Sequence, residues 1–158
     1  MVENLYGNRL RVRVCGLYRA GDCLLMVRHR GLGPTGTLWL PPGGGVSFGE
    51  TAPAALEREF TEETGLRVQT GELLFVNELL APPLHALELF FAVSATGGTL
   101  RRGTDPEMPP DAQLIDEVRL VPFAELKTYP PDTVHSLFRH CDSLDDVLGL
   151  RGYLPKNP

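Results

Sequence analysis

Short apolar runs separated by turn residues occupy most of the chain up to residue 121. In the first run, apolar positions alternate with Arg11 and Arg13. Ala20-Gly21-Asp22 then turns the chain into the second run, a pattern typical of a β-hairpin. The sequence predicts strands over residues 10–19, 23–28, 39–40, 66–68, 73–80, 86–95 and 115–121.

Two longer segments are predicted to be helical. Thr51 is an acceptable N-cap, Pro53 is tolerated in the first turn, and Gly65 ends the first helix as a left-handed cap. A second helix begins at Asp132 and runs through Cys141. Its apolar side consists of Val134, Leu137, Phe138 and Cys141. Strands interrupted by one long helix and followed by another favour an α/β fold with a mixed sheet between helices.

The first predicted helix carries three carboxylates on one side, those of Glu59, Glu62 and Glu63. Like charges three and four residues apart destabilise a helix by roughly 0.2–0.5 kcal/mol per pair. A divalent cation such as Mg²⁺ would offset this repulsion, because hard cations bind oxygen ligands. A solvated acidic face is the other explanation of a run of glutamates.

The spacing of the surrounding residues favours the metal site. From Gly44 to Leu66 the chain reads GGVSFGETAPAALEREFTEETGL, with Glu50 and Arg58 at fixed intervals before the acids. This segment resembles the Nudix box of the Nudix hydrolases at every fixed position. Phe60 stands where that family more often has Ile, Leu or Val. The resemblance extends roughly over residues 10–141.

The resemblance implies the fold, the cofactor and the catalytic groups. It implies a Nudix-like α/β/α sandwich, formed as a single domain over residues 1–158, with 142–158 a C-terminal extension of unknown role. Arg58, Glu59, Glu62 and Glu63 are then the catalytic residues, with Arg58 orienting the acids. The three glutamates would bind Mg²⁺ or Mn²⁺, and the backbone carbonyl near Gly43 is a further candidate ligand.

The implied reaction is hydrolysis of a nucleoside diphosphate linked to another moiety, by attack of metal-activated water on phosphorus. In the family the general base is often an acid outside the box. Such acids in this chain are Glu88, Asp105, Glu107, Asp111 and Glu117. Glu88 lies in a strongly apolar run, where an acid is unusual enough to indicate function.

Arg28 and Arg30 follow the second strand, where related enzymes often contact substrate, and with Glu88 they are candidate substrate-binding residues. A solvated basic turn is the alternative explanation for the two arginines. Pro82, beyond the box, resembles a proline of the ADP-ribose pyrophosphatases, so ADP-ribose or another nucleotide sugar is the first choice of substrate.

Two other functions stay open. One is a (d)NTP pyrophosphatase that maintains the nucleotide pool. The other is a non-catalytic module that binds nucleotides, although such modules have typically lost acids of the box, and this chain keeps Glu50, Arg58 and the three helix glutamates.

Composition limits the partners. The 158 residues, 42% of them hydrophobic, suit one domain with a substantial core. A net charge of −5 argues against a nucleic-acid polymer as partner. The N-terminus, Met1-Val2-Glu3-Asn4, lacks the features of a signal peptide, and no apolar run reaches the roughly 20 residues that cross a bilayer. We therefore expect a soluble cytoplasmic protein without a membrane partner.

The cysteines and the residues near the C-terminus give further expectations. Cys15, Cys23 and Cys141 have no metal-ligand spacing and are expected to be buried, reduced thiols. Residues 144–150 are expected to form a short helix. Residues 152–154 are expected to pack on the body of the protein or on a second subunit, so a homodimer stays open.

Overall fold

The computed structural model describes residues 5–106, 108–110 and 113–155, and it contains two β-sheets. The first has the strand order β5 (Gly43–Gly45), β1 (Arg9–Leu17), β7 (Leu84–Gly98), β6 (Leu66–Ala81) and β9 (Gly152–Leu154). The second consists of β2 (Arg19–Ala20), β3 (Cys23–Arg30), β4 (Thr37–Leu40) and β8 (Ile115–Pro122), with β8 paired to β3. β1 runs parallel to β7 and β6 parallel to β9, whereas the other strand pairs are antiparallel.

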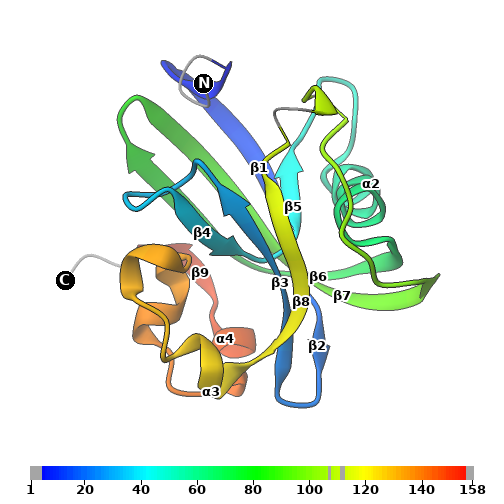
Figure 1. Cartoon of the computed structure of the whole chain (residues 1–158), viewed down its shortest axis with the longest axis vertical. Coiled ribbons are helices and arrows are strands. Elements are labelled where there is room, and N and C mark those ends of the chain that lie inside the picture. Colours follow the sequence, from blue (N-terminus) through cyan, green and yellow to red (C-terminus); the bar gives the residue numbers. More distant parts are fainter. Residues whose placement is uncertain (1–4, 107, 111–112, 156–158) are drawn as a thin grey trace.

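Helices cover the strands from two sides (Figure 1). The long helix α2 (Ala52–Thr64) lies on one side. On the other side lie α3 (Phe123–Leu126), α4 (Leu144–Gly149) and two 3₁₀ turns, η2 (Pro131–Thr133) and η3 (Ser136–His140). The predicted α/β class with helices around mixed strands is therefore confirmed.

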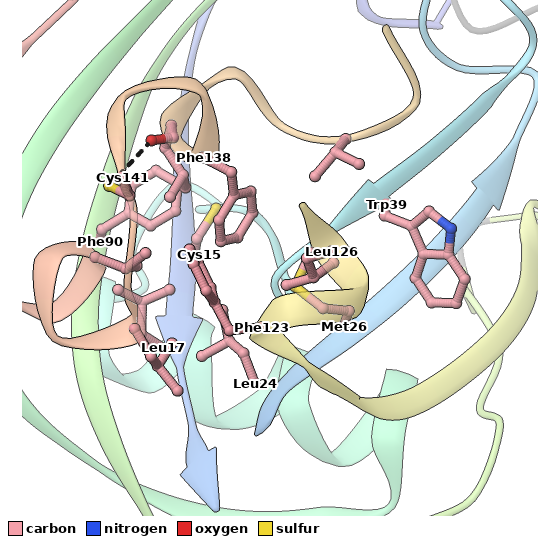
Figure 2. Packing of buried hydrophobic residues seen from close by; sticks show 14 of the residues in the cluster. Cys15, Leu17, Leu24, Met26, Trp39, Phe90, Phe123, Leu126, Phe138 and Cys141 are labelled. Atoms are coloured by element: carbon pink, nitrogen blue, oxygen red, sulfur yellow. Dashed lines mark hydrogen bonds between the residues drawn. The ribbon is translucent and has the colours of Figure 1, made fainter. Parts of the chain in front are cut away.

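Strand β3 illustrates how one apolar run contributes side chains to the hydrophobic clusters on both of its faces. Leu25 packs in the cluster that contains Leu56 and Phe60 of α2. Its neighbours Leu24 and Met26 point the other way, into the larger cluster under α3 and α4 (Figure 2). Strands buried on both faces read as continuous apolar segments rather than alternating ones, and this segment of the sequence does so.

The caps of α2 are as predicted. The Thr51 side chain accepts a hydrogen bond from the Ala54 backbone N–H at 3.2 Å, and Gly65 has a φ of 77° in the left-handed region. The helix therefore begins and ends where the sequence places it, which fixes the faces on which its glutamates lie.

The predicted helix from Asp132 to Cys141 is wrong. This segment forms η2 and η3, which are separated by Val134, in an extended conformation, and His135. Val134 bridges to Trp39 of β4, and the His135 backbone N–H donates to the Trp39 carbonyl at 3.0 Å, so pairing with a strand replaces a helical turn. The predicted apolar side chains are nevertheless buried: Val134, Leu137, Phe138 and Cys141.

Other differences concern the strands. The segments predicted at 66–68 and 73–80 form one strand, β6, whose pairing with β7 shifts register near Thr70 and Leu73. The glycines 43–45 form β5, and residues 152–154 form β9, which pairs with residues 75–77 of β6 and so packs on the body of the same chain. The short helix predicted near residue 144 is confirmed as α4.

All three cysteines are free; Cys15 and Cys141 are buried and Cys23 is half-buried. Within the described residues, no helix is both long and apolar enough to span a membrane.

Candidate active site

A cavity of about 480 Å³ lies where the two sheets meet. The first sheet contributes Arg11 and Arg13 of β1, the glycines of β5 and Glu88 of β7, and the second sheet contributes His29 and the β4 leucines. Helix α2 contributes Glu59 and Glu63 to the same wall. The remaining lining includes apolar side chains, namely Leu32, Leu79, Leu84, Leu114 and Ile115. The cavity thus has an acidic part beside α2 and an extended apolar part.

Glu63 is the most deeply buried acid of the box, with 4% of its surface exposed. One carboxylate oxygen accepts a hydrogen bond from the Gly43 backbone N–H at 3.1 Å. The other, Oε2, is buried and has no hydrogen-bond partner among the described residues. Burial, followed by the charge of Glu59, raises the pKa of Glu63 well above its usual range.

His29 does not supply the missing partner. Its Nε2 lies 3.7 Å from Glu63 Oε2, beyond hydrogen-bond distance. Burial, assisted by the nearby charge of Arg13, lowers the pKa of His29 to about 4. The ring is therefore neutral near pH 7 and supplies no positive charge to Glu63.

Glu59 lies against the glycine strand. A Cβ atom at Gly44 would collide with the Glu59 carboxylate, so the absence of a side chain at residue 44 makes room for this acid. Burial raises the pKa of Glu59 to about 7. Burial thus raises the pKa of both neighbouring carboxylates by more than the nearby arginines lower it.

Arg58, which does not line the cavity, forms hydrogen bonds with three acids of the box. Its Nε and Nη2 donate to the two oxygens of Glu50 at 2.8 and 3.0 Å, and its Nη1 donates to Glu59 at 3.1 Å. The same Nη1 contacts Glu62 at 3.2 Å. Glu50 therefore fixes the guanidinium, and the guanidinium turns Glu59 and Glu62 toward each other.

Some of the groups that a hard divalent cation requires are present in the cavity wall. Glu59 and Glu63 supply carboxylate oxygens, one of them unpartnered, and Gly43 brings backbone to the same wall. With Glu62 held by Arg58, no group of three His, Cys, Asp or Glu side chains among the described residues is arranged to hold a metal ion. That Glu59, Glu62, Glu63 and the Gly43 carbonyl bind a metal together stays a prediction.

The two arginines predicted to bind substrate are not brought to the cavity. Arg28 pairs with Glu117 at 3.5 Å and Arg30 with Asp116 at 3.1 Å, and neither lines the cavity. Because side chains alternate along a strand, it is His29 between them that faces the cavity.

Glu88 lines the cavity but is fully engaged. It is 1% exposed and accepts hydrogen bonds from Arg13 at 2.9 Å, Asn77 at 2.9 Å and His135 at 2.8 Å. Burial alone would raise the pKa of Glu88, but His135, Arg13 and Asn77 together lower it to about 2. A carboxylate of such low basicity is a poor general base.

The other acids outside the box differ in position. Asp105 lines the cavity together with Glu59 and Glu63. Glu117 pairs with Arg28 and Arg119 and lies outside the lining. Glu107 and Asp111 lie outside the described residues.

Sequence reasoning missed Arg13, His135 and Arg139, which also line the cavity. The alternation of Arg11 and Arg13 in the first strand was visible and placed both side chains on one face. Nothing in the sequence indicated that this face would border the acids of α2.

Comparison with known proteins identifies a matching protein family. Residues 7–139 match the model of the NUDIX domain. An ADP-ribose pyrophosphatase of Methanocaldococcus jannaschii is 32% identical over 96 residues, which are 60% of this chain and 56% of that protein. An 8-oxo-dGDP phosphatase of Mus musculus, NUDT18, is 33% identical over 108 residues, 65% of this chain and 32% of that protein. The matches thus span about half and a third of these relatives.

Solved structures share the fold. A NUDIX hydrolase from Nitrosomonas europaea aligns with a TM-score of 0.67 at 21% identity, covering 95% of this chain and 98% of that one. An ADP-ribose pyrophosphatase from Streptococcus suis aligns with a TM-score of 0.60 at 15% identity, covering 90% and 97%.

Proposed function

Because the chain belongs to the Nudix family, we propose that it hydrolyses a nucleoside diphosphate linked to another moiety, with ADP-ribose or another nucleotide sugar as the first candidate. The observation that carries the proposal is the buried, unpartnered oxygen of Glu63 beside Glu59 in the cavity wall. A buried carboxylate without a partner is costly, so a site that keeps one is expected to bind a cation.

The chain's own residues divide the work. Glu59 and Glu63, joined by Glu62, would hold Mg²⁺ or Mn²⁺, and Arg58 keeps Glu59 and Glu62 oriented. When bound, the cation would supply positive charge to the diphosphate and lower the pKa of an attacking water. We assign Asp105 as acceptor of the water's proton, because it lines the cavity together with Glu59 and Glu63.

The size and lining of the cavity support a substrate larger than a diphosphate. About 480 Å³ lies in the range of sites that enclose a nucleotide-sized ligand. Ala81 and Leu84 line the cavity on either side of Pro82-Pro83, so the turn whose proline resembles that of ADP-ribose pyrophosphatases borders the proposed substrate. The name of the archaeal relative supports the same substrate class.

A nucleoside di- or triphosphate is the second candidate. The name of the mouse relative, an 8-oxo-dGDP phosphatase, supports it. The two candidates share the acids of α2 and differ in the moiety that the apolar part of the cavity would receive.

A substrate panel tests the proposal. The protein is incubated with Mg²⁺ and ADP-ribose, other nucleotide sugars, and normal and oxidised (d)NTPs and (d)NDPs, and the products are separated by chromatography. We expect cleavage of ADP-ribose to AMP and ribose 5-phosphate, and a loss of about 10²–10³ in kcat for Glu63→Gln, since the substitution removes charge but little volume.

Glu57→Gln is the matched control. It makes the same chemical change on the same helix, but Glu57 bonds Thr70 and does not line the cavity. Parent-level turnover by Glu63→Gln would contradict the site. Cleavage of only the (d)NTPs or (d)NDPs would replace the first substrate candidate by the second. Mg²⁺-dependent nucleotide binding without cleavage would identify a binding module.

A further inference from the structure

Arg13 is a cation in the cavity wall, and one nitrogen of its guanidinium is already hydrogen-bonded. Its Nη1 donates to Glu88 Oε2 at 2.9 Å, its side chain is 17% exposed, and it lines the cavity together with Glu59 and Glu63. In the part of the chain that the structure describes, its guanidinium makes no other hydrogen bond shorter than 3.5 Å. The remaining donors are thus available to a ligand on the acidic side of the cavity.

Glu88 is anchored from three separate segments. Its Oε1 accepts from Asn77 of β6 and from His135 Nε2, while its Oε2 accepts from Arg13 of β1. The Leu137 backbone N–H donates to His135 Nδ1 at 3.0 Å, so Nδ1 is an acceptor. Nε2 therefore carries the hydrogen and donates the hydrogen bond to Glu88. The ring of Phe90 packs edge-on against the imidazole with centroids 5.4 Å apart.

These contacts hold the Arg13 guanidinium in one orientation. Burial would lower the pKa of Arg13, but the negative groups around it, including Glu88, Glu63 and Glu59, raise it, so the group stays charged. Breaking a buried ion pair is costly, and an apolar pair of the same size is often at least as stable. Stability alone therefore does not explain a charged pair at this position, whereas a ligand with negative charge does.

We propose that Arg13 binds a phosphoryl oxygen of the substrate's diphosphate, and that Glu88 is a positioning residue that aims its guanidinium. The inference rests on the proposed function for the identity of the diphosphate. A planar guanidinium suits phosphoryl oxygens, and Arg13 lines the same cavity as the acids of α2, Glu59 and Glu63. Glu88, which the sequence offered as a base or substrate ligand, acts through Arg13.

The test measures binding and so does not depend on turnover. The affinity of α,β-methylene ADP, whose P–C–P bridge cannot be hydrolysed, is compared with that of adenosine by calorimetry in Mg²⁺. The variants are Arg13→Lys and the double variant Arg13→Gln/Glu88→Gln, which removes both charges and leaves no unpaired buried acid. We expect both to weaken the analogue about 10- to 100-fold and to leave adenosine binding unchanged.

Arg9→Gln is the matched control, because Arg9 lies on the same strand outside the cavity and bonds the Leu5 carbonyl. It should bind the analogue like the parent. Parent-level affinity in the folded double variant, or no binding of the analogue by the parent, would overturn the proposal. If the parent binds the analogue through Arg13 yet cleaves nothing in the panel, the proposed function fails while this inference stands.

Glu88→Gln separates positioning from base catalysis. Where a substrate is cleaved, the variant should raise KM several-fold and leave kcat and its pH profile close to the parent's. A fall in kcat of about 10²–10⁴ with loss of the acidic limb of the profile would make Glu88 the general base and contradict its assignment here. Rescue of analogue affinity by Glu88→Asp, which keeps the charge, is expected to be partial.

Discussion

At the scale of single residues, the acids of the site are arranged at the expense of stability. Glu63 keeps an unpartnered buried oxygen, and burial together with the charge of Glu59 raises its pKa. The raised pKa of Glu63 means that the folded protein holds a proton that the unfolded chain releases. The folded state therefore loses stability as the pH rises above the ordinary pKa of glutamate.

One prediction follows for metal-free protein. In the presence of a chelator at pH 7, Glu63→Gln should unfold at a higher temperature than the parent, because the amide is neutral and folding no longer requires residue 63 to take up a proton. Added Mg²⁺ should raise the melting temperature of the parent more than that of the variant, since a ligand that binds only the folded state stabilises it. Equal shifts in both proteins would show that Glu63 does not bind the ion.

At the scale of elements, the glycine strand β5 and helix α2 form one unit. β5 pairs with β1 through Gly43, Gly44 and Gly45, and α2 lays Glu59 against Gly44. A strand of three glycines has little intrinsic preference for the extended state. Its conformation comes from pairing with β1, and its lack of side chains lets the acids approach the backbone.

Gly44→Ala tests this unit. The new methyl group would meet the flexible end of the Glu59 side chain, so we expect the protein to fold and the carboxylate to be displaced. A displacement of about 1 Å can lower turnover by about 10²-fold. Gly45→Ala is the control, because its Cβ would approach only Arg11 Nη2, at 3.1 Å. Comparable turnover of the two variants would contradict the role of Gly44, and circular dichroism checks the fold of each.

At the scale of the whole molecule, residues near the C-terminus complete the larger core. Leu144 and Val147 of α4 are buried in the cluster that contains Cys15 and Phe138, and Figure 2 shows Cys141 and Phe138 in the same packing. The same region holds His135, which bonds Glu88 in the cavity. Segments far apart in the sequence thus fix the wall of the site together.

Leu144→Ala should lower the free energy of unfolding by about 2–5 kcal/mol, because it leaves a cavity in the core. Denaturation in urea measures the loss, and turnover per folded molecule should be unchanged, since Leu144 does not line the cavity. The exposed neighbour Asp145 provides the control, and Asp145→Ala should change stability little. A Leu144→Ala variant as stable as the parent would show that α4 is not part of the folded core.

The sequence by itself determined most of the strands, the first helix with both caps, and the acids that this helix carries, because these features depend on local periodicity and on residues close in the chain. Tertiary structure alone decided that residues 132–141 pair with β4 rather than form a helix, and that His29, not its neighbouring arginines, faces the cavity. It also decided that Glu88 is engaged by Arg13, Asn77 and His135. Each of these outcomes depends on which segments distant in the sequence meet, and a single chain's local pattern carries no record of that.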